Sequence, residues 1–398
     1  MREVDVCVVG AGPVGGTLAC LLAQSGVRTA IIDRAALPPM EHKAFDGRAY
    51  AIAAGSRDVM QEAGVWDRLP TDPGAIREIR VSDGKLGRQA SRLHLHFDVN
   101  DVDAEAFGWM VEARSLRVAL NGLLHALPEL AVHAPATAQV TRHDDGAEIM
   151  IDGGETLRAR LVVAADGRTS ALRQAAGIPV THLPYDQVGI VCTIAHGRPH
   201  NGVALEHFLP AGPFALLPMA GQPDEPNISA IVWTERTDMA AHIMALDDER
   251  FVRELVRRLG TALGAVRLLG GRWSYPLAAL LVHRYTAPRL ALIGDAAHGI
   301  HPIAGQGLNL GFRDVAVLAG LVADAVRAGE DPGSPALLRR YQAARRPDNM
   351  AMLAATDALD RLFSNNVRPI RRARDIGIAA VNRIGPLRRM FMRQAMGA

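Results

Sequence analysis

The first 34 residues of the chain carry the pattern that most restricts its fold. An apolar run, VDVCVV at residues 4–9, is followed directly by GAGPVGG, then by TLACLLAQSG and VRTAIIDR. The outer segments have the length and β-branched content of buried strands, and the middle segment has a helical periodicity that ends at Gly26. The sequence therefore predicts a strand, a glycine turn, a helix and a second strand, as in dinucleotide-binding domains.

Each position of this motif has its own part in binding a dinucleotide. Gly10 allows the tight turn, Gly12 lets the backbone approach a pyrophosphate, and Gly15 lets helix and strand pack closely. The helix N-terminus favours the phosphate charge. Asp33, followed by Arg34, ends the second strand and is placed to accept hydrogen bonds from an adenosine ribose. A carboxylate there repels a 2′-phosphate, so the motif predicts FAD or NAD and does not choose between them.

Two later strand ends and one arginine favour FAD. LRARLVVAADGRTSALRQAAG (157–177) and RLALIGDAAH (289–298) each resemble a buried strand that ends in an acid and a glycine. Carboxylates at strand ends suit the hydroxyl groups of a ribityl chain, which NAD lacks. An arginine shortly after the second strand supplies the fixed positive charge that a flavin pyrophosphate requires. The candidate contacts in these segments are Arg48, Asp166, Gly167, Gly294 and Asp295.

The composition sets wider limits. A chain of 398 residues with 49% hydrophobic residues can form two closely packed domains. Its three cysteines are widely spaced in apolar surroundings, which disfavours a disulfide framework or a metal cluster. No secretory signal and no apolar run of about 18 residues is present. We therefore expect a cytoplasmic protein, with contact to the inner face of a membrane left open. The formal net charge of +2 gives no reason to expect a nucleic-acid partner.

These motifs, together with the loop GDAAHGIHPIAGQGLNLGFRD (294–314), resemble the class A flavin aromatic hydroxylases. Within that class, the loop and the later segment RRPDNMAMLAATDALDRLFSN (345–365) are most similar to the ubiquinone-biosynthesis hydroxylase family. The likeness runs from Met1 nearly to Ala398. It implies an α/β fold with a Rossmann-like FAD-binding domain, of the glutathione reductase and p-hydroxybenzoate hydroxylase type, an inserted antiparallel-sheet substrate domain and C-terminal helices.

The resemblance also implies a division of the chain into parts. The expected FAD-binding domain is discontinuous and comprises residues 1–75, 100–180 and 285–345. The expected substrate domain comprises residues 76–99 and 181–284, and a helical, basic segment covers residues 346–398. Residues 186–234 contain apolar, β-branched runs broken by Pro and Gly, which predicts the antiparallel sheet. The candidate chamber walls on these runs are Phe214, Leu216, Pro218 and Trp233, for each of which ordinary core packing is an equal alternative.

Further flavin contacts follow from the resemblance alone. In the family, the acid of the GD pair binds the ribityl chain, and the loop after it presents backbone N–H groups to the flavin. A backbone contact to adenine falls at Val140. Ala113 departs from the polar residue that many class A members have there, with Arg114 or Arg117 as alternatives. We interpret His298 and His301 as structural, because their spacing is not that of a zinc site. The expected loop contacts are Pro302, Gly305, Gln306, Gly307, Leu308 and Asn309.

The resemblance implies an FAD-dependent monooxygenase. NAD(P)H would reduce the flavin, O₂ would add at its C4a atom, and the resulting hydroperoxide would hydroxylate the ring of a polyprenylated phenol in ubiquinone biosynthesis. No second glycine motif offers NAD(P)H a domain of its own, so it is expected to dock transiently. The general base, the ring position and a reductase partner as electron source stay open.

Four other functions share an FAD site with this one. A glutathione reductase type requires a redox cysteine pair, and a flavin halogenase requires a WxWxIP-type motif; the sequence shows neither. An FAD-dependent reductase of an isoprenoid substrate and a non-catalytic FAD-binding scaffold in a quinone-biosynthesis complex stay as alternatives.

The C-terminal part of the chain hints at the kind of partner. Residues 368–393 hold eight arginines against one acid, Asp375, interleaved with apolar residues. Such a segment suits docking to an anionic bilayer or to partner enzymes that handle a polyprenyl substrate. A solvated helix that closes the FAD-binding domain is the equal alternative.

Overall fold

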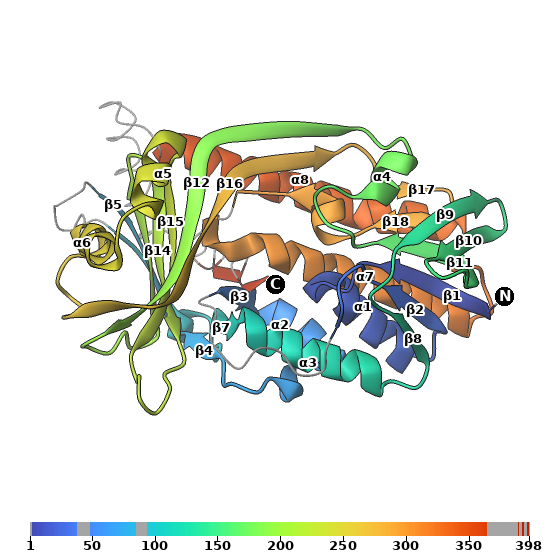
Figure 1. Ribbon diagram of the computed structural model, residues 1–398, viewed down its shortest axis with the longest axis horizontal. Coiled ribbons are helices and arrows are strands. Elements are labelled where there is room, and N and C mark those ends of the chain that lie inside the picture. The colour runs from blue at the N-terminus through green and yellow to red at the C-terminus, as the bar shows by residue number, and fades with distance from the viewer. Residues whose placement is uncertain are drawn as a thin grey trace.

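The computed structural model describes residues 2–37, 48–84, 94–301 and 303–363, together with Arg389, Met392, Arg393, Met396 and Gly397. Two large sheets and one small sheet make up the β-structure of this part of the chain. Figure 1 shows the first sheet near the N-terminus and the second at the far end of the molecule, joined by two long strands.

The first sheet has a parallel core in the order β8, β2, β1, β11, β18, with β17 antiparallel at one edge and the hairpin β9–β10 on β11. Its two central strands are apolar in their C-terminal halves, at residues 6–9 of β1 and 161–164 of β11, as strands covered on both faces must be. The strands are β1 (Arg2–Val9), β2 (Thr29–Ile32), β8 (Leu130–His133), β9 (Ala138–His143), β10 (Gly146–Ile151), β11 (Thr156–Ala164), β17 (Thr286–Ala287) and β18 (Leu290–Leu292).

The helices α1, α3 and α7 pack together beside this sheet and share its hydrophobic core. Helix α1 is buried over most of its surface because it lies between the sheet and the other two helices. The helices are α1 (Pro13–Gln24), α2 (Ala54–Glu62), α3 (Ala113–Ala126), α4 (Ala171–Ala175), α5 (Thr237–Met244), α6 (Asp248–Leu259), α7 (Gln306–Arg327) and α8 (Pro335–Phe363). Short 3₁₀ turns occur at Trp66–Arg68, Val99–Asp101, Gly294–Ala296 and Ile303–Gly305.

The second sheet has the order β19, β16, β12, β15, β14, β13, β5, β6, and its neighbours are antiparallel except β13 and β5. The long strands β12 and β16 extend from it toward the first sheet, and α5 and α6 cover its outer face (Figure 1). Its strands are β5 (Glu78–Asp83), β6 (His94–Asp98), β12 (Val180–His196), β13 (Val203–Leu209), β14 (Gly212–Met219), β15 (Ile228–Arg236), β16 (Val266–Val282) and β19 (His298–Gly299). A third sheet contains β3 (Ala49–Ala53), β4 (Gly74–Ile76) and β7 (Gly108–Glu112).

The predicted fold class is confirmed. The expected strand, glycine turn, helix and strand appear as β1, the turn at Gly10, α1 and β2, and the expected antiparallel sheet appears between β12 and β16. The strands of the second sheet fall in residues 78–98 and 180–282, apart from the two-residue strand β19. The division into domains stays our proposal.

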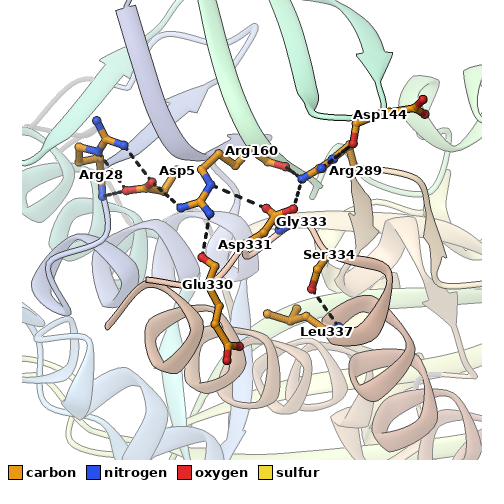
Figure 2. A network of polar contacts seen from close by, with 10 residues as sticks. All are labelled: Asp5, Arg28, Asp144, Arg160, Arg289, Glu330, Asp331, Gly333, Ser334 and Leu337. Carbon is orange, nitrogen blue, oxygen red and sulfur yellow. Dashed lines mark hydrogen bonds and ion pairs between the residues drawn. The ribbon is translucent and has the colours of Figure 1, made fainter. Parts of the chain in front are cut away.

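A network of ion pairs and hydrogen bonds fastens the parallel strands at the edge remote from the glycine turn (Figure 2). Asp5 on β1 pairs with Arg28, which precedes β2, at 3.0 Å and with Arg160 on β11 at 3.6 Å. Arg289, which precedes β18, pairs at 2.6 Å with Asp331 in the connection between α7 and α8. Asp5 and the three arginines precede or lie within the strands, so the network leaves the carboxyl ends of the strands free for the candidate site.

Two expectations cannot be compared with the structure. Pro302 and nearly all of the basic segment 368–393 lie outside the described residues. Among the helices that are described, none has both the length and the apolar character needed to cross a bilayer.

Candidate functional site

The glycine turn after β1 has the geometry that its sequence predicts. Gly10 has a φ of +107°, and a Cβ atom there would lie 2.3 Å from the carbonyl oxygen of Ala165. A Cβ atom on Gly15 would lie 2.0 Å from the carbonyl oxygen of Gly10, so both positions require glycine for packing inside the protein. Gly12 differs, because a Cβ atom there would meet nothing within 4 Å. Its open space lies at the N-terminus of α1, where a pyrophosphate is favoured.

Asp33 is held at the mouth of this turn. Its Oδ2 atom accepts a hydrogen bond from the backbone N–H of Ala11 at 2.6 Å, and its Oδ1 atom accepts one from Ala35 at 2.8 Å. These bonds fix the carboxylate at the end of β2, where a ribose bound across the turn would meet it. Arg34, the next residue, is exposed.

A cavity of about 490 Å³ opens between the glycine turn and the second sheet. Its wall on the first-sheet side comes from the glycine turn, from β3 and from the loops that follow β11 and β18. These residues are Gly12, Pro13, Val14, Gly15, Ala49, Tyr50, Ala51, Ala165, Arg168, Ile293, Gly294, Asp295, Ile300, Gly305, Gly307 and Leu308. The opposite wall belongs mainly to the second sheet and consists of Met110, Val191, Glu206, Pro213, Ala215, Leu217, Ala230, Val232 and Thr234.

The two predicted strand ends meet at this cavity. Asp295 lines it and pairs with Arg168, at a distance of 3.7 Å between Oδ2 and Nε. Asp166 lies next to the lining residue Ala165; its Oδ2 atom accepts a hydrogen bond from Leu172 N–H at 3.3 Å. Its Oδ1 atom is buried and has no hydrogen-bond partner in the described part of the chain. The strand ends therefore offer carboxylate oxygens to hydroxyl groups of a bound ligand.

The loop before α7 forms the adjoining part of the wall. Gly305 caps this helix in the left-handed conformation, with a φ of +63°, and a Cβ atom on Gly307 would meet nothing within 4 Å. The side chain of Asn309 donates hydrogen bonds to the carbonyl oxygens of Ala51 and Gly305 at 3.0 and 3.1 Å. Asn309 thus holds the loop against β3, and any ligand contact it makes must come from its backbone.

Both helix N-termini, of α1 and of α7, open toward this cavity. Each contributes the partial positive charge of its unpaired N–H groups. One end suits a pyrophosphate, and the other suits the negative charge that a reduced flavin carries. Together with the open space at Gly12 and Gly307, this arrangement fits FAD.

Behind the GD pair, a fully buried carboxylate supports the loop. Asp314 on α7 accepts hydrogen bonds through Oδ2 from Gly294 N–H at 3.0 Å and from His298 Nε2 at 2.7 Å. Its Oδ1 atom accepts them from Arg345 Nε at 2.8 Å and Asn349 Nδ2 at 3.3 Å. Burial raises the pKa of the Asp314 carboxyl, but His298 and Arg345 outweigh it and hold that pKa below its ordinary value.

The two histidines of the loop contact protein side chains. His298 is bound to Asp314, and the Nε2 atom of His301 lies 3.2 Å from Oε1 of Gln187 on β12 and 3.7 Å from Asp360 on α8. Both rings are buried. In the described ranges no group of three or more His, Cys, Asp or Glu side chains is arranged to hold a metal ion.

The predicted chamber walls are not where the cavity is. Phe214, Leu216 and Trp233 are buried on the outer face of the second sheet, packed against α5 and α6. Pro218 is four residues after Phe214 on β14, so it lies on the same face of the strand, and it is not among the cavity-lining residues. Because side chains alternate along a strand, the neighbouring residues line the cavity instead. The large side chains of Phe214 and Trp233 fill the core under the helices.

Several residues that the sequence predicts as FAD contacts are not among the cavity-lining residues. Val140 borders a separate pocket of about 260 Å³ with Leu172 and Leu290. The guanidinium of Arg48 lies 5.8 Å from the ring centre of Trp273, next to the lining strand β3. Arg114 and Arg117 are on α3 and do not line the cavity.

The sequence reasoning missed other lining residues. Ala49, Tyr50 and Ala51 form β3, and their signal was the apolar run directly after Arg48. Arg168 follows the Asp166–Gly167 pair directly. Glu206 on β13 gave no signal, because a single acid in an apolar run shows its face only once the sheet register is known.

Comparison with known proteins agrees with this geometry. Residues 3–356 match the family model described as FAD binding domain. The chain is 51% identical to the ubiquinone hydroxylase UbiL of Rhodospirillum rubrum, a match that covers 100% of this chain and 90% of that protein. It is 34% identical to the 3-demethoxyubiquinol 3-hydroxylase of Escherichia coli, over 100% of this chain and 99% of that protein.

A solved structure gives the same fold. The probable FAD-dependent monooxygenase PqsL of Pseudomonas aeruginosa superposes with a TM-score of 0.78 and 24% identity, over 95% of this chain and 100% of that one. The family model and the two relatives span nearly the whole chain, and the site has the glycine turn, strand-end acids and loop that FAD requires. The chain therefore belongs to the FAD-dependent hydroxylases of ubiquinone biosynthesis.

Proposed function

We propose that this FAD-dependent monooxygenase inserts one oxygen atom of O₂ into the aromatic ring of a prenylated phenol, with NAD(P)H as the electron donor. The observation that supports the proposal most is the cavity itself, which runs from the glycine turn and the α7 loop to an apolar face of the second sheet. A cofactor bound at the first wall would face a substrate ring bound at the second.

The residues of the first wall have separate roles in holding FAD. The N-terminus of α1 at Gly12 receives the pyrophosphate, and Asp33 receives the adenosine ribose. Asp166 and Asp295 accept hydrogen bonds from the ribityl chain, and the backbone at Gly307 and Leu308 borders the flavin ring. Bound FAD supplies the exchange of two electrons with NAD(P)H and the activation of O₂.

The residues of the second wall act on the substrate. Val191, Ala215, Leu217 and Val232 present an apolar surface to the cavity, which favours an aromatic ring and excludes water. A ring held against this surface is oriented toward the flavin side, and orientation is a main contribution of the protein to such a reaction. The prenyl chain adds apolar area that the same wall can bury.

Two alternatives are separated from this proposal by stoichiometry. A reductase of an isoprenoid double bond would oxidise NAD(P)H without consuming O₂, and a scaffold would do neither. A hydroxylase consumes one O₂ for each NAD(P)H and each product molecule. Thiol chemistry is disfavoured, because Cys7, Cys20 and Cys192 are all buried, and burial raises the pKa of each thiol to about 12.

We also propose peripheral contact with the inner face of a membrane through the basic segment 368–393. Its eight arginines and interleaved apolar residues support this assignment. Full-length protein should sediment with anionic liposomes, and a chain truncated after Asn365 should bind them more weakly. Equal binding by a truncated protein that retains FAD would remove the membrane role.

The function is tested by complementation. The gene is expressed in bacterial strains that each lack one ubiquinone-ring hydroxylase, and quinones and accumulated intermediates are quantified by mass spectrometry. Restored ubiquinone in one strain identifies the ring position and supports the proposal. If no strain is restored although FAD-loaded protein is present, the substrate is a different one or the protein is a scaffold.

A further inference from the structure

A single carboxylate stands in the apolar wall that faces the flavin side. Four cavity-lining residues follow one another across the second sheet in register: Val191 on β12 opposes Val232 on β15, Val232 opposes Ala215 on β14, and Ala215 opposes Glu206 on β13. Residues directly opposite each other in a sheet share a face. Glu206 therefore projects from the same face as three apolar residues, into the same cavity.

The next residue on that face of β13 brings Glu206 close to the flavin loop. Phe208 packs in one cluster with Ile303, which directly follows Pro302 before α7, and with Phe363 at the end of α8. The rings of Phe208 and Phe363 stack with their centres 4.1 Å apart. Glu206 thus lies between the apolar substrate wall and an element that borders the predicted flavin ring.

Glu206 has no structural partner. Its side chain makes no hydrogen bond or ion pair with any residue of the described ranges. The neighbouring strands present Ala215 and Val81 beside it. The other charged side chains of the cavity, Arg168 and Asp295, are 3.7 Å apart and pair with each other. The side chain is half-buried and faces the cavity. A carboxylate there that only stabilised the fold would be expected to have a donor, because a ligand that fills the cavity removes water from an unpaired charge at a cost.

We propose that Glu206 is the proton acceptor for the phenolic hydroxyl of the substrate. The inference rests on the proposed function. A phenol ring becomes a better acceptor of an electrophilic oxygen atom as its O–H proton leaves. Among the described lining residues of the second wall, Glu206 is the one whose side chain can take that proton at neutral pH.

The phenolic O–H bond breaks, its proton goes to a carboxylate oxygen of Glu206, and its electron pair stays on the phenol oxygen and is delocalised into the ring. The ring carbon forms its new C–O bond with one oxygen atom of O₂, whose O–O bond breaks; the other oxygen atom leaves as water with the two electrons from NAD(P)H and two protons. The new oxygen takes up one proton and the same ring carbon loses its hydrogen as one proton, so this exchange with water is balanced. Glu206 returns its proton to the first oxygen, so the carboxylate is regenerated and the ring carries one additional hydroxyl group.

The pKa of Glu206 suits this role. Burial raises it to about 7, and no charged group contributes to the shift. A general base is most effective when its pKa lies near the working pH. The base form is lost as the pH falls below about 7, so the reaction should slow toward acid pH.

The kinetic test uses FAD-loaded protein, NADPH or NADH, and 2-(3-methylbut-2-enyl)phenol as the probe. Glu206→Gln should lower kcat by about 100-fold at pH 8, within the range that a positioned base contributes, and change KM little. The wild-type kcat should fall as the pH is lowered below 7, and the kcat of the variant should not show this acid limb, that is, this fall at low pH. Glu148→Gln, which changes an exposed glutamate on β10, is the matched control and should behave as wild type.

A binding measurement without turnover gives an independent readout. With oxidised FAD-loaded protein and no NAD(P)H, the wild type should bind the phenol more tightly than prenylbenzene, which lacks the hydroxyl group, and this preference should fade below pH 7. Glu206→Gln should show a preference that does not change with pH.

The outcomes separate the two proposals. If the wild type oxygenates the phenol and Glu206→Gln keeps its rate and its acid limb, Glu206 is not the acceptor. If the wild type oxygenates no phenol although FAD is bound, the proposed function fails. A loss of rate in Glu206→Gln that leaves the pH dependence of phenol binding intact would assign Glu206 a merely structural role and would also overturn the inference.

Discussion

The buried carboxylate of Asp314 offers the sharpest test of how the site is supported. Asp314→Asn keeps the shape of the side chain but removes the charge that compensates Arg345, which is itself 5% exposed. Breaking a buried ion pair from one side costs about 3–5 kcal/mol. Arg345 retains Asp348 at 2.7 Å, so we expect the lower end, about 3 kcal/mol. The new amide would also place a donor against Gly294 N–H, at the loop that holds Asp295.

Urea denaturation of FAD-loaded protein measures this prediction, with flavin fluorescence reporting cofactor release. We expect a loss of about 3 kcal/mol in unfolding free energy and weaker retention of FAD. Asp324→Asn is the control, because it changes an exposed aspartate of the same helix, whose surface ion pair contributes less than about 1 kcal/mol. Equal effects of the two substitutions would refute the assignment of Asp314 as the support of the loop.

The charge of Asp314 also limits the pH range in which the folded protein is stable. Its pKa is lower in the folded protein than in the unfolded chain, so its stabilisation is present above about pH 4 and is lost as the pH falls through the folded value. FAD retention by the wild type should therefore decline below about pH 4 more steeply than that of Asp314→Asn.

Four further substitutions test other parts of the structure. Gly12→Val should fold with an unchanged melting temperature but bind no FAD, because its side chain enters the open space proposed for the pyrophosphate. Gly15→Ala should lower the melting temperature, because its Cβ atom meets the carbonyl oxygen of Gly10. Ala215→Leu should keep FAD and lower kcat/KM for the prenylated phenol by about 10-fold or more, because it fills the apolar wall. Glu206→Gln should raise the free energy of unfolding by about 1–3 kcal/mol at pH 8 and not at pH 4. The reason is that burial raises the pKa of Glu206 in the folded protein to about 7, so the wild type loses stability as the pH rises through that value. Equal gains at both pH values would contradict this.

Local sequence patterns predicted the geometry of the first wall of the cavity. Glycines that pack against backbone, as at Gly10 and Gly15, and acids that follow apolar strands, as at Asp33 and Asp295, depend on residues adjacent in the chain. Parallel strands bring their carboxyl ends to one edge of a sheet, so the union of distant segments at the cavity followed from the fold class.

The second wall of the cavity could not be predicted in the same way. The choice between Leu216 and its neighbour Leu217 depends on which face of β14 meets the flavin loops, and alternation alone does not fix this. Glu206 became recognisable only through the register of the second sheet, and Asp314 only through partners far away in the chain. Phe214 and Trp233 lie on apolar runs of this sheet, and such runs supply core residues as readily as cavity walls.

The most direct test of the central claim is a reaction of FAD-loaded protein with NAD(P)H, the prenylated phenol probe and oxygen-18 gas, followed by mass spectrometry of the product. The account predicts a ring-hydroxylated product that carries one oxygen-18 atom, formed in equal amount to the O₂ and the NAD(P)H consumed. A product without the label, or NAD(P)H oxidised with only hydrogen peroxide formed, would contradict it.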